Sequence, residues 1–386
     1  MTAATPLPRP NLRVHAAAVA GAFMLNGASF GIWAARIPAV KEQTNLDAAG
    51  LGFALLGASV GAVLTMTFGG WLSSKFGTHV MTPLTTIGCA VMMVFIGASR
   101  DFAGLTIALL IFGISQGTMD VSMNANGIAV EHAGAGPIMS RLHASWSIGA
   151  FAGALASTQV AALGIAVFPE FAVAAAGLAI GGVILRFTML PDKHAEGGGR
   201  LRLPTGPLAL LGALALFGLM AEGSATDWSG VYLQSTMNAS QGVAGLAVTT
   251  FTGSMAVARL AGDRLSLRLG SARLVSGGAA LAALGLGLAL AVQIPAVAIV
   301  GFGMMGLGLA AVVPTLFRAA GSQPGIPASV GIAAVSTMGY AGGLIGPPVI
   351  GTVAGIATLR GSLLIILVML VILVIAGGRA LARPKA

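Results

Sequence analysis

Apolar runs of about twenty residues recur along the whole chain, and this pattern constrains the fold more than any other feature of the sequence. A helix needs roughly 20 apolar residues to cross the hydrocarbon core of a membrane. Charged, proline-rich or glycine-rich segments separate the runs and delimit twelve predicted membrane-spanning helices. These cover residues 16–35, 48–68, 80–98, 105–129, 139–163, 168–189, 207–233, 242–261, 273–292, 296–317, 328–357 and 362–381.

The composition agrees with a protein that is surrounded by lipid. Of the 386 residues, 56% are hydrophobic and 8% are charged, whereas a soluble protein carries about 25% charged residues because its surface faces water. The net charge of +9 comes from Lys and Arg residues spread singly through short connectors. Because nucleic-acid binding needs a clustered basic face, we expect no nucleic-acid partner. The predicted fold class is therefore an all-α, multi-pass membrane protein.

Positive charges are unequally divided between the two sides of the predicted topology. With a cytoplasmic N-terminus, 16 of the Lys and Arg residues fall on the inner side and 4 on the outer side. Membrane proteins carry such an excess of positive charge in their cytoplasmic loops. We therefore expect both termini to be cytoplasmic. A single copy of the chain suffices for this architecture, and we expect a monomer.

The longest polar connector divides the chain into two halves of six helices. It predicts an N-terminal bundle over residues 1–190, a cytoplasmic linker over 191–206 and a C-terminal bundle over 207–386. A weak internal repeat supports this division, since GGWLSSKFGTH at 69–79 matches the layout of GDRLSLRLGSA at 262–272. Two related halves around a central pathway are a recurring design of secondary transporters.

The first copy of this repeat resembles a loop of the major facilitator superfamily. In that superfamily the loop between helices two and three follows the pattern G-x-x-x-D-R/K-x-G-x-R/K, and Ser74 stands at its acidic position here. The second copy keeps Arg268 and Gly270, and the glycine- and proline-rich segment 339–351 is similar to the eleventh helix of these proteins. The resemblance implies two pseudo-symmetric six-helix bundles and a transporter rather than an enzyme.

A shorter segment resembles one branch of that superfamily, the fucose permeases. Asp120 precedes Asn124 by four residues, and HASWSIG follows at 143–149. That branch also uses a first-helix Asp four residues before a proline, but Ala34 stands four residues before Pro38 here. The branch includes bacterial permeases of poorly defined substrate and rhizopine-transport-like proteins. The resemblance implies a bacterial inner-membrane protein that moves a sugar, a polyol or a derivative.

Ionisable residues deep in a membrane helix are costly, and they tend to line water or substrate paths. Asp120 and Glu222 are the main candidates, and either carboxyl group could carry a proton as water access alternates between the two sides. Gln116, Asp120 and Asn124 lie four residues apart on one helical stripe. We interpret this stripe as the lining of a solute cavity, and the alternative is a hydrogen-bond network between packed helices.

The predicted seventh helix carries a second polar face. Glu222 and Thr226 share this face, whereas Asp227 points well away from Glu222. Asp227 is a further candidate for a water or substrate path, and the alternative is a place at the outer end within reach of water. On the fifth helix, His143 is either a solute ligand and proton partner of Asp120 or a neutral packing residue.

Aromatic and amide side chains complete the predicted solute site. Sugar and polyol rings stack on indole faces such as those of Trp33 and Trp146, while amide groups bind hydroxyls. Asn26 and Tyr340 lie on helical stripes that extend the site. For Trp33 and Trp228 the alternative is a place in the aromatic belt at the outer membrane interface.

Four charged residues are predicted to act in gating. Arg259 and Asp263 are four residues apart at the inner end of the eighth helix, a spacing that allows a salt bridge. Lys75 and Arg268 occupy matching inner loops of the two halves and could pair with carboxylates when the inner side closes. The alternative for these two cations is a solvated charge that only sets orientation.

Several classes of protein lack support in the sequence. The five His residues are scattered without an H-E-x-x-H motif, and no Gly-rich loop ends in Gly-Lys-Ser or Gly-Lys-Thr. We therefore expect no metal, no cofactor and no enzymatic activity. The predicted function is proton-coupled symport of a small hydroxylated solute, with the solute and the proton as partners. The alternative is a proton-driven exporter of drugs or metabolites.

Overall fold

The computed structural model describes residues 11–192 and 205–381, and nearly all of these residues are helical. The first half consists of α1 (Leu12–Gln43), α2 (Ala48–Phe76), α3 (Thr78–Ala98), α4 (Phe102–Val130), the short π-helix η1 (Glu131–Ala135), α5 (Met139–Ala162) and α6 (Val167–Thr188). The second half consists of α7 (Pro207–Met237), α8 (Gln241–Leu269), α9 (Ser271–Val292), α10 (Pro295–Leu309), α11 (Val312–Gly321), α12 (Ala328–Ile356) and α13 (Leu359–Leu381).

The helices account for the twelve predicted spans. Within the described ranges, eleven helical segments are long and apolar enough to cross a membrane, with α10 and α11 forming one of them. The twelfth span is α5, whose 24 residues include Arg141, His143 and several serines. These polar residues lower its hydropathy, and α5 packs against α1 of its own half and α8 of the other. Its polar character reflects a place near the centre of the molecule.

The tenth predicted span differs from the prediction because it is broken in the middle. Helix α10 ends at Leu309, and α11 begins at Val312 after a turn at Ala310 and Ala311. Pro314 explains the break, because a proline has no N–H to bond the carbonyl group four residues earlier and its ring crowds that carbonyl. Pro314 lies in the first turn of α11, where its missing N–H costs least.

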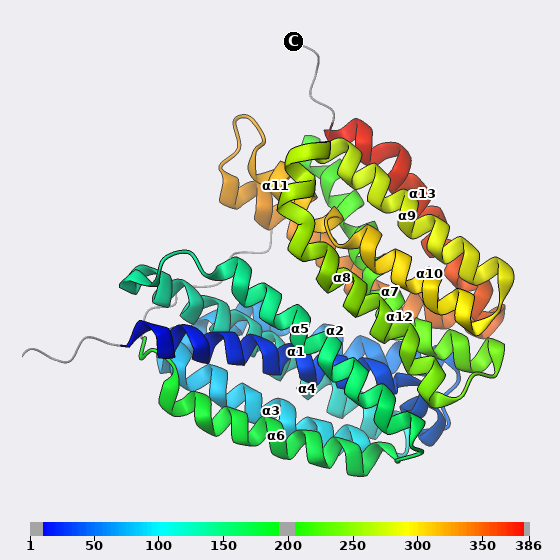
Figure 1. The fold of residues 1–386 in the computed structure, drawn as a ribbon, viewed down its shortest axis with the longest axis horizontal. Helices are drawn as coiled ribbons and strands as arrows, with labels where there is room; N and C mark the ends of the chain where they lie inside the picture. The colour runs from blue at the N-terminus through cyan, green and yellow to red at the C-terminus, as the bar shows by residue number, and fades with distance from the viewer. Residues whose placement is uncertain (1–10, 193–204, 382–386) are drawn as a thin grey trace, which may run out of the picture.

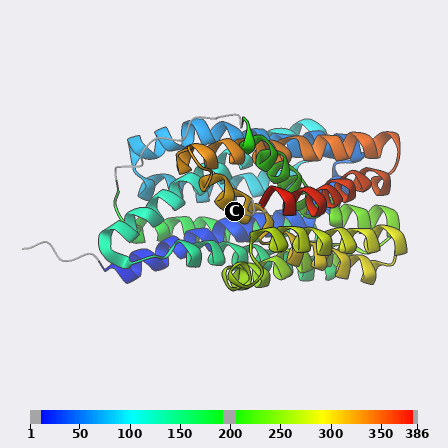
Figure 2. The same ribbon diagram turned by 90° about the horizontal axis from the view of Figure 1, so that it is seen from above.

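The helices pack as two bundles of six spans (Figure 1). In the first half α1 packs against α5, α2 against α4, and α3 against α6. In the second half α7 packs against α12 and α13, and α10 packs against α8 and α9. Seen from above, the helices of both halves run roughly along one common direction (Figure 2). This arrangement matches the expected pair of pseudo-symmetric bundles.

The internal repeat has the same backbone structure in both halves. Gly77 ends α2 with a φ of 88°, and Gly270 ends α8 with a φ of 75°. The N–H of Gly77 donates to the carbonyl oxygen of Ser73 at 2.9 Å, and that of Gly270 donates to Ser266 at 3.0 Å. Only glycine adopts a positive φ without steric cost, which explains its place in both copies.

Two seams join the halves, one between α5 and α8 and the other between α2 and α12. We call the end where α1 begins and α13 ends the terminal face, and the opposite end the far face. Near the far face, a Cβ on Gly52 would lie 2.5 Å from the carbonyl oxygen of Pro347, and a Cβ on Gly351 would lie 2.5 Å from that of Ala48. Glycine therefore lets α2 and α12 approach closely at this end.

The two bundles diverge toward the terminal face (Figure 1). Asp120 on α4 and His143 on α5 lie on the terminal side of the seams, and the side chains of both are solvent-exposed. The molecule is therefore closed at the far face and open at the terminal face.

Candidate functional site

A cavity with two connected lobes lies between the halves. The larger α4 lobe has a volume of about 530 Å³ and is bordered by α1, α2, α4, α5, α7 and α12. The smaller α8 lobe has a volume of about 210 Å³ and is bordered by α1, α5, α7, α8 and α12. Phe30, Trp146, Thr226 and Tyr340 line both lobes, so the two form one continuous space. A cavity of this size accommodates a small organic solute.

A network of amide and indole groups forms one wall of the α4 lobe. Asn26 Nδ2 donates to Gln116 Oε1 at 2.5 Å, and Trp146 Nε1 donates to Asn26 Oδ1 at 2.8 Å. Gln116 Nε2 in turn donates to Ser29 Oγ at 3.1 Å. These contacts tie α1, α4 and α5 together. The structure thus brings together Asn26, Gln116 and Trp146, which sequence reasoning had placed on three separate helices.

Asp120 lines the α4 lobe one turn from Gln116. Asn124 Nδ2 donates to the carboxylate of Asp120 at 3.2 Å and to its carbonyl oxygen at 2.8 Å. Asn124 is not among the residues that line either lobe. Its contact with the solute space therefore passes through Asp120, whose carboxylate it orients.

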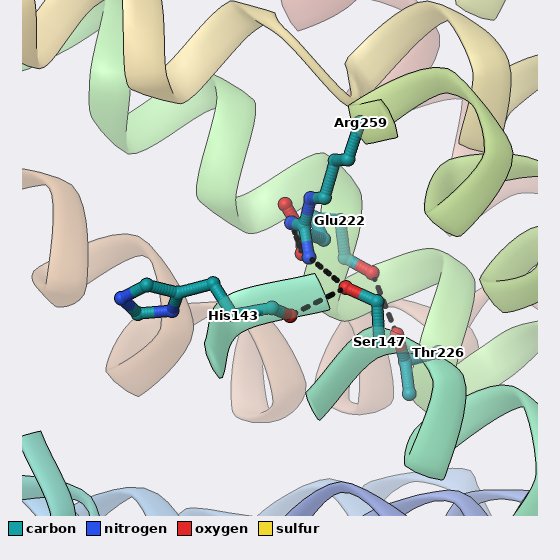
Figure 3. Close-up of polar contacts among 5 residues, drawn as sticks. All are labelled: His143, Ser147, Glu222, Thr226 and Arg259. Carbon is teal, nitrogen blue, oxygen red and sulfur yellow. Dashed lines mark hydrogen bonds and ion pairs between the residues drawn. The ribbon is translucent and has the colours of Figure 1, made fainter. Parts of the chain in front are cut away.

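The α8 lobe contains an ion pair. Arg259 Nη2 lies 3.1 Å from Glu222 Oε1, and Arg259 Nη1 donates to Ser147 Oγ at 3.5 Å (Figure 3). Thr226 Oγ1 donates to the backbone carbonyl of Glu222 at 3.0 Å. Arg259 was expected to pair with Asp263, whose side chain lies outside the described residues. That pair stays a prediction, and the structure shows that Arg259 lines the cavity and pairs with Glu222.

His143 is not brought into the cavity. Its imidazole points away from Glu222 and Arg259 (Figure 3) and packs edge-on against Phe23, with ring centroids 5.3 Å apart. Only its backbone carbonyl joins the polar contacts, by accepting from Ser147 at 3.2 Å. The ligand interpretation of His143 is therefore not supported in this conformation, because the ring sits about one turn closer to the terminal face than Trp146.

Two tryptophans that lie towards the far face, Trp33 and Trp228, are buried. Trp33 is 4% exposed and lines the α4 lobe, and Trp228 is fully buried. The aromatic-belt alternative is wrong for both, because a belt residue would face lipid. Tyr340 reaches both lobes from α12 and is 43% exposed, so its ring faces the open cavity.

The two loop cations lie at the terminal face. Lys75 and Arg268 are both exposed. Lys75 Nζ lies 5.1 Å from the ring centroid of Trp71 and 5.4 Å from that of Phe76. Neither cation lines the cavity, and their gating role stays a prediction.

Asp227, for which the sequence left both a solute path and the outer water open, is a cavity residue in the structure. It lines the α4 lobe with Asp120, while Glu222 lines the α8 lobe. Helical periodicity correctly predicted that the two acidic residues of α7 point in different directions, about 140° apart at 100° per residue. The cavity wraps around α7, so both directions face solute space. The sequence signal for this position is the carboxylate itself, because carboxylates are rare within membrane spans and tend to line water or solute paths.

An ion pair at the far face was missed by sequence reasoning. Arg36 Nε lies 3.0 Å from Glu170 Oε2, and both side chains are buried. Arg36 also donates to the backbone carbonyl of Ile165 and, at 3.4 Å, to Gln241 Oε1 on α8. Gln241 Nε2 donates to Glu42 at 3.1 Å. Sequence reasoning counted Arg36 only as one of four outer charges.

Two membrane-spanning bundles around a central cavity that contains a few polar and charged side chains define a multi-pass membrane transporter. Comparisons with known proteins agree. The chain is 34% identical to the uncharacterized transporter y4wD of Sinorhizobium fredii over 89% of this chain and 92% of that protein. It is 32% identical to an uncharacterized MFS-type transporter of Yersinia pestis over 94% of both chains. The membrane protein MosC of Rhizobium meliloti is 31% identical over 95% of this chain and 90% of MosC.

Solved structures show the same fold at low sequence identity. The nucleoside transporter NupG superposes with a TM-score of 0.79 at 14% identity, covering 96% of this chain and 100% of NupG. A bacterial homologue of the lysosomal transporter Spinster, in an inward-facing and occupied conformation, gives a TM-score of 0.71 at 13% identity over 95% of this chain and 96% of that one. No model of a known protein family matches the sequence.

The chain belongs to the major facilitator superfamily of transporters. It is a membrane transport protein and not an enzyme, as the sequence predicted.

Proposed function

We propose that this protein carries a small hydroxylated solute, such as a sugar, a polyol or a derivative, across a bacterial inner membrane by proton-coupled symport. The observation that carries the proposal is the hydrogen-bonded set of Asn26, Gln116 and Trp146 beside Asp120 in one cavity. Amide groups both donate and accept hydrogen bonds, which suits hydroxyl groups. The indoles of Trp33 and Trp146 offer apolar faces to a ring.

Asp120 and Glu222 have different roles in the proposed mechanism. Asp120 has no basic partner among the residues that line its lobe, so it is the proton carrier, with Asn124 orienting its carboxylate. Glu222 is already paired with Arg259. Protonation of Glu222 would weaken that pair and free Arg259, which would couple proton binding to movement between α7 and α8.

Alternating access follows from movement of two bundles, residues 1–190 and 207–386, about the cavity. The 16 to 4 division of Lys and Arg supports a cytoplasmic terminal face. The open terminal face is then the inward-facing state. Lys75, Arg259, Asp263 and Arg268 would act when this face closes. A monomer contains the complete pathway.

Proton movement into weakly buffered, right-side-out membrane vesicles tests the proposal. Sugars, inositols and their amino derivatives are added one at a time, and the external pH is recorded. We expect a solute-dependent alkalinisation that is lost in Asp120→Asn and weakened in Glu222→Gln. Asp101→Asn is the matched control, because Asp101 caps α4 at the far face and Asn caps a helix equally well.

Two results would contradict the proposal. An alkalinisation that survives both substitutions would show that neither Asp120 nor Glu222 carries the proton. If the protein folds normally but no sugar or polyol produces a pH change, the solute is not a hydroxylated compound. Proton-driven export of drugs or metabolites then becomes the favoured function.

A further inference from the structure

The wall of the α4 lobe carries two carboxylates without a basic counterpart. Asp120 of the first half and Asp227 of the second both line it, and no Lys, Arg or His is among the described residues that line this lobe. The α8 lobe differs, because Arg259 neutralises its Glu222 at 3.1 Å. The proposed function uses Asp120 as a proton carrier and leaves Asp227 without a role.

The two carboxylates of the α4 lobe lie at different depths. One turn from the carboxylate on α4, Gln116 bonds to Asn26 of α1. One turn from the carboxylate on α7, a Cβ on Gly230 would lie 2.9 Å from Cγ of Pro38, which is also on α1. These two levels of α1 are about twelve residues apart, which is roughly 18 Å at 1.5 Å per residue. Both carboxylates lie on the terminal side of these contacts, so Asp227 is the deep one, near the closed far face.

The surroundings of Asp227 offer its carboxylate no partner. Among the residues that the structure describes, none forms a hydrogen bond or an ion pair with this half-buried side chain. Apolar side chains of Trp33, Leu55 and Phe112 line the far part of the lobe. An ionised carboxylate is costly in such surroundings, and a bound proton removes its charge. The position therefore suits a group that exchanges a proton as water access changes.

The basic groups of the neighbouring helices are not available to Asp227. On α1, Arg36 pairs with Glu170 at 3.0 Å, and on α8, Arg259 pairs with Glu222 at 3.1 Å in the other lobe. The remaining titratable groups on the wall of the α4 lobe are those of Asp120 and Tyr340. The other described Lys and Arg residues of the helices that pack against α7 do not line the lobe, and these are Arg13, Lys41, Arg268, Arg318, Arg360 and Arg379. A proton is therefore the cation that can neutralise Asp227.

We propose that Asp227 is a second proton-exchanging carboxyl group, which takes a proton from the water of the far side when that face opens. The inference rests on the proposed function, in which Asp120 carries a proton nearer the terminal face. The two groups are too far apart to share a proton, so each carries its own and two protons accompany each solute. Protonation of Asp227 removes the charge at the deep end of the cavity, and the far face then closes without burying an unpaired carboxylate.

Infrared spectroscopy of the purified full-length protein tests this assignment without a solute. A protonated carboxyl group has a C=O stretching band that a carboxylate lacks, and spectra are compared between mildly acidic and mildly alkaline buffer. We expect a band that grows on acidification, with one component lost in Asp227→Asn and a different one lost in Asp120→Asn. Asp227→Glu retains a carboxyl group and should keep a shifted component. Asp101→Asn, which alters an exposed carboxylate at the far face, should keep both components.

A second measurement uses the wild type alone. Dicyclohexylcarbodiimide modifies protonated carboxyl groups in apolar surroundings, and mass spectrometry of the resulting peptides locates the modified residue. Modification of Asp227 should increase as the pH falls, over the same range as its infrared component. A carboxyl group that stays protonated for packing alone would be modified equally at every pH, so this measurement separates proton exchange from a structural role.

Two spectroscopic results would overturn the inference. One is a spectrum of Asp227→Asn that equals that of the wild type at every pH, and the other is an Asp227 component that does not change with pH.

Failure of the proposed function looks different. If the Asp227 component titrates but no sugar or polyol drives proton uptake into vesicles, the second proton site stands and the proposed function does not. If a sugar or polyol does drive uptake, protons and labelled solute are counted in the same vesicles. We expect two protons per solute in the wild type and one in Asp227→Asn. A ratio of one in the wild type would leave symport through Asp120 in place and remove the second site.

Discussion

Two ion pairs among the residues that the structure describes have nearly the same length but lie in very different surroundings. At the far face, Arg36 and Glu170 are 3.0 Å apart with side chains 1% and 7% exposed. In the cavity, Arg259 and Glu222 are 3.1 Å apart with side chains 33% and 23% exposed. Each pair lies within one half, and each arginine also reaches a polar side chain of the other half, Gln241 or Ser147.

This difference shows how the same chemistry serves a closed end and an open one. A buried pair cannot lose a partner without leaving an uncompensated charge, so it resists opening. A partly exposed pair exchanges its contacts with water at little cost, so it can rearrange. Arg36 therefore helps to hold the far face closed, whereas Arg259 can exchange its contacts when the two halves move.

Removing Arg36 should have the largest effect on stability. Arg36→Met keeps much of the side-chain volume but leaves Glu170 buried without its partner, which costs about 3–5 kcal/mol. The thermal unfolding midpoint of the purified protein should fall sharply. Adding Glu170→Gln should recover part of the loss, because it removes the stranded charge. Arg100→Gln, at an exposed arginine near the same face, should leave the midpoint unchanged. A small fall in the unfolding midpoint of Arg36→Met would show that the buried ion pair contributes no more to stability than the partly exposed one.

A methyl group in the α2 and α12 seam should have an intermediate effect. Gly52→Ala places a Cβ 2.5 Å from the carbonyl oxygen of Pro347, and such overpacking costs about 1–3 kcal/mol. Gly69→Ala on the same helix meets no atom nearer than 3.6 Å and should be tolerated. The two unfolding midpoints are compared directly. Equal midpoints would show that the contact of α2 with α12 at Gly52 is no tighter than the looser contact of α2 with α4 at Gly69.

Removing Arg259 should have the smallest effect on stability. Arg259→Gln breaks a partly exposed pair, and pairs of that kind contribute about 0–1 kcal/mol. The unfolding midpoint should stay close to that of the wild type, while solute-driven proton uptake should change because Glu222 loses its counter-charge. A loss of stability as large as that of Arg36→Met would contradict the assignment of this pair to the mobile part of the cavity.

Local sequence features predicted the helices with few errors. The positions of Gly77 and Gly270 followed from the internal repeat, because a positive φ is a local requirement. The break between α10 and α11 was missed although Pro314 was visible. A proline in a span bends or breaks a helix according to its neighbours, so its outcome depends on packing.

The candidate site was predicted in part. Helical spacing put Gln116 and Asp120 on one stripe, and both line the same lobe. Spacing could not reveal that the cavity surrounds α7 and so includes Asp227. It also could not identify Glu222 as the partner of Arg259, or Glu170 as the partner of Arg36, because these residues are separated by 37 and 134 positions in the sequence.

The sequence by itself determined that this chain spans a membrane twelve times in two related halves, because hydropathy and glycine positions act within a single helix or turn. Only the tertiary structure decided which charges are paired, which are buried and which face the solute space. Such pairing depends on how each helix is rotated against its neighbours. That rotation is set by contacts between residues far apart in the chain, such as Gly52 with Pro347 and Arg36 with Gln241.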